Sequence, residues 1–244
     1  MPFPYSEESA AIAAQHIETV LFDYGQVLSN PPDPAAWARM LALTGLDEAP
    51  FHAAYWAFRH DYDRAALTGP AYWHAVANRT GITLTPTQLA GLLAADVDLW
   101  SNLNTPMVEW VGRLQRAGIR TGILSNIGDS MAEGIVAKFP WLSSFDHCTW
   151  SHALFMAKPE PAIFLKTAEA LHAAPADILF LDDREENIAA AAALGFQTLH
   201  YTTHAAFEQE MRERGFASLL DVNVRNLTPN PPPSNGTDSQ FGIA

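Results

Sequence analysis

The chain has 244 residues, 48% of them hydrophobic, which is enough for one large domain or for a core domain with a smaller insert. Its formal net charge of −13 disfavours nucleic acids and anionic membrane surfaces as partners, since both attract basic proteins. The single cysteine excludes an intramolecular disulfide, MPFPYSEESA does not resemble a secretory signal, and no apolar run approaches about 20 residues, so we expect a cytoplasmic protein.

The first predicted element is a buried strand at residues 18–23, where the apolar run Val20, Leu21 and Phe22 ends at Asp23. Gly25 then allows the chain to turn sharply. Open α/β sheets place their chemistry at the carboxyl ends of strands. An aspartate at such a place is, by itself, more often a cap or a turn residue. Its role therefore depends on the segments that follow.

Residues 31–104 are predicted to form a helical insert, because alanine, leucine and aromatic residues recur there at helical spacing. The turn signals Thr68-Gly69-Pro70 and Thr85-Pro86 separate the helices. Most aromatic side chains of the insert are expected in its own core. Three polar residues of the insert merit a test for substrate specificity: Arg59, His60 and Arg64. For each of them, a place on a solvent-exposed helix face is the commoner situation.

Helices and strands alternate after residue 104, which is typical of a doubly wound parallel α/β sheet. The core is therefore assigned to residues 18–30 and 105–221. Residues 222–244 are rich in proline, serine and asparagine and are predicted to be a disordered tail. The predicted helices lie at 105–114, 130–139, 161–173 and 187–194, and the strands at 119–126, 145–151, 178–181 and 196–202.

Later segments of the core supply the partners that an aspartate nucleophile for phosphoryl groups needs. A phosphate dianion repels nucleophiles, so such a site requires positive charge and a well-placed attacking group. Asp23 could attack phosphorus and form an aspartyl-phosphate. Ser125 and Asn126, which end a predicted strand, could bind the transferred oxygens, and Lys158 could offset the remaining charge.

An acid pair, Asp182-Asp183, directly follows the apolar strand at 178–181. Two adjacent carboxylates in this place are electrostatically costly without a cation. Together with Asp23 and the backbone carbonyl of Gly25, the pair could hold a hard divalent cation, and Mg²⁺ is the expected cofactor. Asn187, near the start of the next helix, could orient the pair.

The four segments together resemble the haloacid dehalogenase superfamily of aspartate-nucleophile hydrolases over residues 18–203 or so. AKPEPAIF and LDDREENI are most similar to the subgroup of glucose-1-phosphate phosphatases and the N-terminal phosphatase domains of epoxide hydrolases. The resemblance implies that residues 31–104 are a small helical cap, and that the protein is a magnesium-dependent phosphatase of a small phosphorylated metabolite such as a sugar phosphate. In this resemblance Asp23 matches the family's nucleophile and Ser125 its second motif. Lys158 matches the third motif, and Asp182-Asp183 matches the fourth.

The chain departs from this family pattern at Gly25. The family's phosphatases usually carry there a second aspartate, which acts as general acid and base, and Gln26 cannot donate a proton in the same way. The subgroup named above shows the same glycine in a D-x-G-x-V pattern, so hydrolysis need not be lost. A good leaving group needs less protonation, and a water molecule or a nearby acid such as Asp33 is a further candidate for the role.

Two alternatives stay open. A phosphate-binding or regulatory protein with impaired turnover is favoured by Gly25 and opposed by the retained Asp23 and Lys158. A 2-haloacid dehalogenase attacks carbon and needs no metal, and its first motif resembles D-x-Y-G-T, whereas Tyr24 and Gly25 stand one position earlier here. The sequence contains no HExxH, GxSxG, GxGxxG or Walker pattern, and it does not indicate the oligomeric state.

Overall fold

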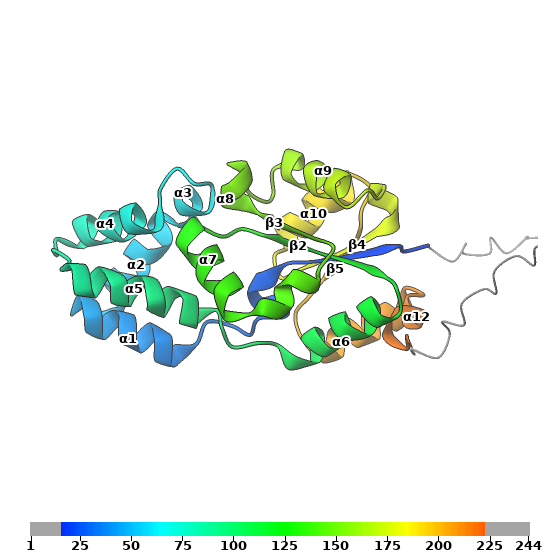
Figure 1. The fold of residues 1–244 in the computed structure, drawn as a ribbon, viewed down its shortest axis with the longest axis horizontal. Coiled ribbons are helices and arrows are strands. Elements are labelled where there is room, and N and C mark those ends of the chain that lie inside the picture. The colour runs from blue at the N-terminus through cyan, green and yellow to red at the C-terminus, as the bar shows by residue number, and fades with distance from the viewer. Residues whose placement is uncertain (1–15, 223–244) are drawn as a thin grey trace, which may run out of the picture.

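The computed structural model describes residues 16–222, and within this range five parallel strands form one sheet (Figure 1). β1 pairs with β2 on one side and with β4 on the other, so that Phe22 lies opposite Ile123 and Leu181. The chain thus reverses its direction across the sheet beside β1, which is where open α/β sheets bind their ligands. The strands are β1 (Thr19–Phe22), β2 (Arg120–Ser125), β3 (His147–Trp150), β4 (Ile178–Asp182) and β5 (Gln197–His200), and their order is β3-β2-β1-β4-β5.

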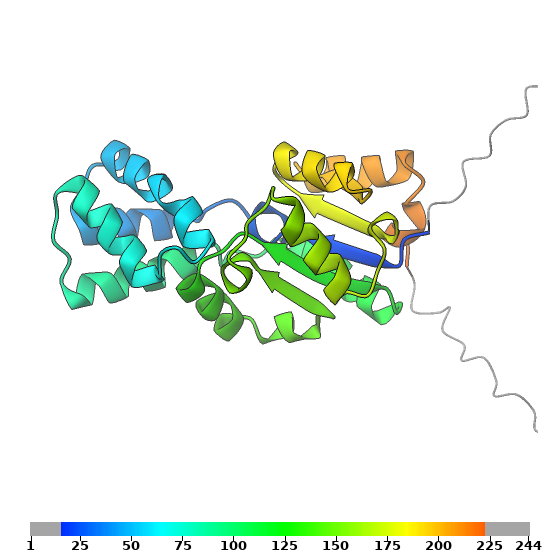
Figure 2. The ribbon, with the colours of Figure 1, turned by 90° about the horizontal axis from the view of Figure 1, so that it is seen from above.

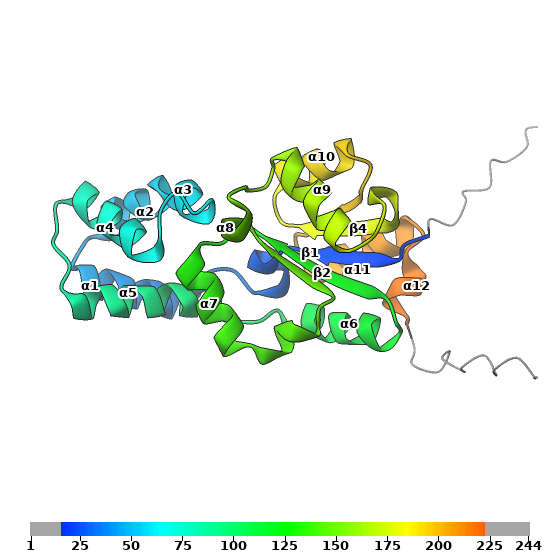
Figure 3. The ribbon, with the colours of Figure 1, turned by 45° about the horizontal axis from the view of Figure 1, so that its top comes forward.

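Helices cover both faces of the sheet, as Figure 3 shows. β1 illustrates the reason, because its side chains alternate between two apolar layers. Phe22 packs into one cluster with Trp110, and Leu21 packs into the other with Phe164. A strand buried on both faces reads as a continuous apolar run, and the predicted parallel α/β core is confirmed. The core helices are α6 (Thr105–Arg116), α7 (Asp129–Lys138), α8 (Ser151–Leu154), α9 (Pro161–Ala170), α10 (Glu185–Ala193), α11 (His204–Glu213) and α12 (Ala217–Leu220).

Five further helices between β1 and β2 form a separate helical unit with its own apolar core (Figure 2). The predicted turn signals start two of them, since Thr68 and Thr85 are N-caps whose side chains accept backbone N–H bonds. The unit extends beyond the end of the sheet where the strands finish. Its helices are α1 (Pro34–Thr44), α2 (Glu48–Ala57), α3 (Arg59–Asp63), α4 (Gly69–Thr80) and α5 (Pro86–Leu99).

Several contacts join the helical unit to the core, including the packing of α5 on α7. The two connecting segments run side by side, with an antiparallel bridge between Ser29 and Leu103. On the other side, the Ser151 hydroxyl donates to the Asp63 carbonyl at 2.6 Å and accepts from the Ile127 N–H at 2.8 Å. One buried serine therefore ties α3 of the helical unit to the loop after β2.

Some structure was not expected from the sequence. β1 is followed by a turn at Tyr24–Leu28, which the Ser29 N–H closes by donating to the Tyr24 carbonyl, and α11 and α12 pack into the same apolar cluster as the last strand. α11 was missed because most of its residues are polar and only a narrow stripe, including Phe207 and Met211, is buried. In residues 16–222 no helix is long and apolar enough to cross a membrane. The predicted tail at 222–244 lies, apart from Val222, outside the described residues.

Candidate active site

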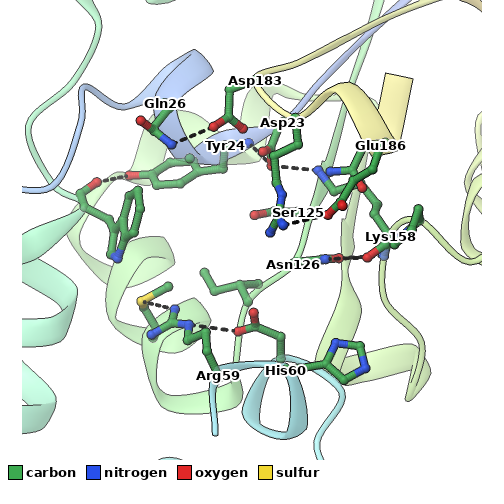
Figure 4. Close-up of a pocket in the computed structure, with 18 of the residues that line it drawn as sticks. Asp23, Tyr24, Gln26, Arg59, His60, Ser125, Asn126, Lys158, Asp183 and Glu186 are labelled. Atoms are coloured by element: carbon green, nitrogen blue, oxygen red, sulfur yellow. Dashed lines mark hydrogen bonds and ion pairs between the residues drawn. The ribbon is translucent and has the colours of Figure 1, made fainter. Parts of the chain in front are cut away.

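The carboxyl ends of β1, β2 and β4 face one pocket of about 420 Å³, which the helical unit closes from the opposite side (Figure 4). A pocket of this size suits a small molecule. Of the residues predicted to bind or react, all except Asp182 line it. The sheet contributes Asp23, Gly25, Ser125, Asn126, Lys158 and Asp183, and the helical unit contributes Trp56, Arg59, His60, Asp63 and Trp100.

A buried ion triad, formed by Lys158, Asp23 and Asp182, lies beneath the pocket. Lys158 Nζ is 2.9 Å from Asp23 Oδ1 and 2.6 Å from Asp182 Oδ2, and all three side chains are buried. Asp182 Oδ1 also accepts from the Arg184 N–H and from Asn187 Nδ2, both at 2.9 Å. Buried charges persist only when their bonding is nearly complete, and here Asn187 holds Asp182 as its place in the sequence suggested.

The electrostatics of this triad are dominated by burial. Burial raises the pKa of Asp23 to about 7, against the opposing effect of Lys158, and Asp182 and Asp183 raise it further. Burial alone would lower the pKa of Lys158, but Asp182 and Asp23 together raise it above its usual value. The lysine is therefore a cation, and a second positive charge near Asp23 would favour its ionised form.

The acid pair meets Asp23 at the pocket floor. One carboxylate oxygen from each of Asp23, Asp182 and Asp183 lies within 4.8 Å of the other two. Asp183 is half buried, and its Oδ2 accepts from Gln26 Nε2 at 2.6 Å. Carboxylate oxygens without nitrogen or sulfur are the donor set of hard divalent cations. These residues therefore fit Mg²⁺, with the carbonyl of Gly25 at the same pocket wall as the expected fourth ligand.

Ser125 and Asn126 differ in how they meet the pocket. Ser125 ends β2 and is buried at the pocket wall. The side chain of Asn126 is engaged elsewhere, since its Oδ1 accepts from the Lys158 N–H at 2.8 Å and its Nδ2 donates to the Lys158 carbonyl at 2.9 Å. Asn126 thus holds the loop that carries the lysine. No local pattern in the sequence indicated this contact, because 32 positions separate the two residues.

Gly25 lies in the turn after β1, against the indole ring of Trp100. Its backbone angles are ordinary, with φ −66° and ψ 130°, so the turn does not require glycine. A Cβ placed on it would lie 3.5 Å from Cζ3 of Trp100. This is an ordinary van der Waals distance, so the indole ring lies in contact with position 25. Asp33 does not supply the acid that position 25 lacks, because its carboxylate caps α1 by accepting from the N–H groups of Ala35 and Ala36 and is not part of the pocket wall.

The helical unit contributes a second ion triad, formed by Arg59, Asp63 and Asp96. Arg59 Nε lies 3.2 Å from Asp63 Oδ1, and Arg59 Nη1 lies 3.3 Å from Asp96 Oδ2. The Tyr55 hydroxyl donates to Asp96 Oδ1 at 2.7 Å. Arg59 and Asp63 also line the pocket, whereas Asp96 does not. Neither acid was identified from the sequence, although Asp63 follows Arg59 at the helical i,i+4 spacing.

The three polar residues singled out in the insert have different surroundings. Arg59 is buried in the second triad, so a solvated face is excluded for it. His60 is exposed and lines the pocket mouth (Figure 4). Arg64 pairs with Glu160 of the core and does not line the pocket. Of the three, Arg59 and His60 are placed to meet a substrate.

Known proteins resemble both the sequence and the fold. Residues 17–195 match the family model of the haloacid dehalogenase-like hydrolases. Bifunctional epoxide hydrolase 2 of Rattus norvegicus is 30% identical over 116 residues, which are 46% of this chain and 21% of that protein. (S)-2-haloacid dehalogenase 1 of Pseudomonas sp. (strain CBS-3) is 28% identical over 89 residues, 36% of this chain and 39% of that protein. The chain thus spans about a fifth of one relative and two fifths of the other.

A solved structure shows the same fold. The HAD family enzyme bt-2542 from Bacteroides thetaiotaomicron, in complex with magnesium and inorganic phosphate, aligns with a TM-score of 0.63 and 22% sequence identity. The alignment covers 77% of this chain and 96% of that one.

Proposed function

The chain belongs to the haloacid dehalogenase-like hydrolases, and we propose that within this family it is a magnesium-dependent phosphatase of a small phosphomonoester. The observation that carries the proposal is the cluster of three carboxylates around one lysine at the pocket floor. Such a cluster is short of positive charge, which a divalent cation would supply. The magnesium and phosphate held by bt-2542 support this choice of cation and ligand.

In the proposed reaction, an oxygen of Asp23 attacks phosphorus and the ester oxygen leaves. Lys158 donates to Asp23 and offsets charge on the transferring group, and Ser125 offers its hydroxyl to a phosphoryl oxygen. A cation held by Asp23, Asp183 and the Gly25 carbonyl, with Asp182 behind them, would screen the attacking carboxylate from the phosphate. Water then hydrolyses the aspartyl-phosphate and regenerates Asp23.

We assign the helical unit, residues 31–104, the role of a cap over a core made of residues 18–30 and 105–221. It closes one side of the pocket, and its exclusion of bulk water strengthens every charge interaction inside. The partner is a small phosphorylated metabolite, with a sugar phosphate as one candidate. The acidic composition and single cysteine suit a cytoplasmic location.

Two other functions have an observation in their favour. The similarity to (S)-2-haloacid dehalogenase 1 favours dehalogenation, but the reaction at carbon gives no use to the third carboxylate, Asp183. The glycine at position 25 favours a phosphate-binding protein with impaired turnover. A binder does not need a carboxylate held 2.9 Å from a buried lysine at the pocket floor.

The test is phosphate release from a panel of sugar phosphates, nucleotides and acyl phosphates, with magnesium or with a chelator. The parent protein, Asp23→Asn and the control Asp33→Asn, which removes a carboxylate outside the pocket, are compared. We expect magnesium-dependent release that Asp23→Asn lowers by at least about 10³-fold and that Asp33→Asn leaves intact. Halide release from 2-chloropropionate without magnesium, in place of phosphate release, would overturn the proposal.

A further inference from the structure

A phosphatase needs a proton donor for the leaving oxygen and an acceptor for the attacking water. Gly25 has no side chain and cannot supply either. Four carboxylates of the described chain line the pocket: Asp23, Asp63, Asp183 and Glu186. Asp23 and Asp183 are assigned to attack and to the cation. Glu186 is half exposed and its Oε1 pairs with Arg184 Nη2 at 2.6 Å, so Asp63 is the remaining buried acid.

Asp63 is held firmly by the core although it belongs to the helical unit. Its carbonyl accepts the Ser151 hydroxyl at 2.6 Å, and Ser151 is completely buried. Ser151 in turn bonds to Ile127, two residues after Ser125. The position of Asp63 is therefore fixed relative to the strand ends. This is the precision that a proton-transfer group requires.

The carboxyl group of Asp63 has free bonding capacity. The residue is 8% exposed and lines the pocket. Oδ1 contacts Arg59 Nε at 3.2 Å but makes no hydrogen bond, so a buried oxygen is left without a bonded partner. Native structures rarely leave such atoms unused, and ligand groups are one way to satisfy them. Asp96, on the other side of Arg59, accepts from Tyr55 and lies outside the pocket wall.

We propose that Asp63 is the general acid and general base of this site, in place of an acid at position 25. The inference rests on the phosphatase function proposed above. As an Asp23 oxygen bonds to phosphorus, the bond to the ester oxygen breaks with its electron pair, and the Asp63 carboxyl gives that oxygen its proton. The Asp63 carboxylate then takes a proton from the water that attacks the aspartyl-phosphate. Asp23 regains its electron pair, and phosphate is released.

The protonation of Asp63 suits this role. Burial raises its pKa to about 6, against the opposing effect of Arg59, so about half of the Asp63 side chains carry a proton at pH 6 and about a tenth at pH 7. Charged and polar groups lie near Asp63 on its own helix and on the elements packed against it. Around α3 these are Arg59, His60 and Tyr62 on the helix itself, Tyr55 on α2, Tyr72 on α4, Asp96 on α5, Asp129 on α7 and His152 on α8.

The first experiment compares two esters that differ in their need for a proton. 4-Nitrophenolate leaves as a stable anion, whereas the alkoxide of glycerol phosphate must be protonated. We expect Asp63→Asn to lower kcat/KM for glycerol phosphate by about 10²–10⁴-fold and for 4-nitrophenyl phosphate by less than about tenfold. The matched control Asp96→Asn also removes one carboxylate from Arg59, and any loss it causes should be equal for the two esters.

The second experiment uses the parent protein alone and therefore does not depend on the folding of a variant. The ratio of kcat/KM for the alkyl ester to that for the aryl ester, with each value expressed per phosphate dianion present at that pH, cancels the titration of protein groups that both reactions share and of the esters themselves. We expect this ratio to fall as pH rises through about 6, because Asp63 loses its proton. His60→Gln should leave the fall in place, which separates Asp63 from its exposed neighbour.

The outcomes distinguish this inference from the function on which it rests. Equal losses for both esters in Asp63→Asn, or no loss in either, would overturn the assignment of Asp63. A ratio that is flat with pH, or that becomes flat only in His60→Gln, would do the same. A parent protein that hydrolyses neither ester in magnesium would instead remove the phosphatase function, and the role of Asp63 with it.

Discussion

Two buried triads, each with one basic residue between two aspartates, lie on opposite sides of the pocket. Lys158 lies between Asp23 and Asp182 in the core, and Arg59 lies between Asp63 and Asp96 in the helical unit. In the first, a single Nζ contacts two carboxylates within 2.9 Å. In the second, separate nitrogens of a planar guanidinium reach the acids at 3.2 and 3.3 Å. The lysine is a point charge shared by both acids, whereas the arginine contacts each acid with a different nitrogen.

The difference lies in what else can neutralise the acids. The acids around Lys158 meet a third carboxylate, Asp183, and together they fit a divalent cation. The acids around Arg59 have no further carboxylate within such a cluster in residues 16–222. The first triad can therefore accept an added cation, while in the second Arg59 alone supplies the positive charge. Buried charges destabilise a protein when they lose their partners. Removal of a bound divalent cation should therefore affect the Lys158 triad and leave the Arg59 triad unchanged.

The largest expected effect tests this contrast directly. Lys158→Met and Arg59→Met each leave two buried acids uncompensated, which should lower the free energy of unfolding by about 3–5 kcal/mol without divalent cations. Magnesium should restore much of the loss in Lys158→Met, because it binds the folded state, and little in Arg59→Met. Urea unfolding with and without magnesium measures both. Equal recovery in the two variants would contradict the distinction between the triads.

A somewhat smaller effect concerns the pH dependence of the second triad. Burial raises the pKa of Asp63 from 3.8 to about 6, so between these values the folded protein binds the proton more tightly than the unfolded chain. The stability from this group is complete below pH 3.8 and is lost as pH rises through about 6. The free energy of unfolding of the parent, relative to Asp63→Asn, should fall by up to about 3 kcal/mol between pH 4 and pH 7. A difference that is constant with pH would refute it.

The next effect concerns Asp183, the third carboxylate of the cluster beside the Lys158 triad. Asp183→Asn removes one charge from the three-carboxylate cluster and should raise the magnesium concentration for half-maximal phosphate release by more than about tenfold, or 1.4 kcal/mol. Glu185→Gln is a matched control, because Glu185 is an acid of the same segment that lies outside the cluster and the pocket wall. An unchanged magnesium requirement in Asp183→Asn would exclude Asp183 from the cation site.

The smallest effect concerns the backbone of Gln26, whose side chain donates to Asp183. Gln26 adopts a left-handed conformation with φ 57°, which costs a non-glycine residue about 1 kcal/mol. Gln26→Gly and Gln26→Ala both lose the bond to Asp183, but only glycine relieves the backbone. The glycine variant should therefore be more stable than the alanine variant by about 1 kcal/mol in thermal or urea unfolding. An alanine variant of equal stability would show that the turn is unstrained.

How far the sequence could predict the site follows from the same two regions. Asp23, Ser125 and Asp182 end parallel strands, and the carboxyl ends of neighbouring strands meet at one edge, so a linear pattern was enough to bring them together. Arg59 and Asp96 are 37 positions apart on different helices, and their pairing depends on how those helices pack. No periodicity encodes such a contact. The indole of Trp100 over Gly25 was equally hidden.

The connections at Ser29 and Leu103 have a consequence for how this protein can change over evolutionary time. The chain leaves the sheet and returns to it at adjacent points, where the Asn30 N–H donates to the Asn102 carbonyl and the Asn104 N–H donates to the Leu28 carbonyl. An insertion between such points can be lengthened, shortened or exchanged without changing the strand order. Substrate preference can thus change when the whole helical unit is replaced. The strand ends that carry the charged residues of the pocket would stay unchanged.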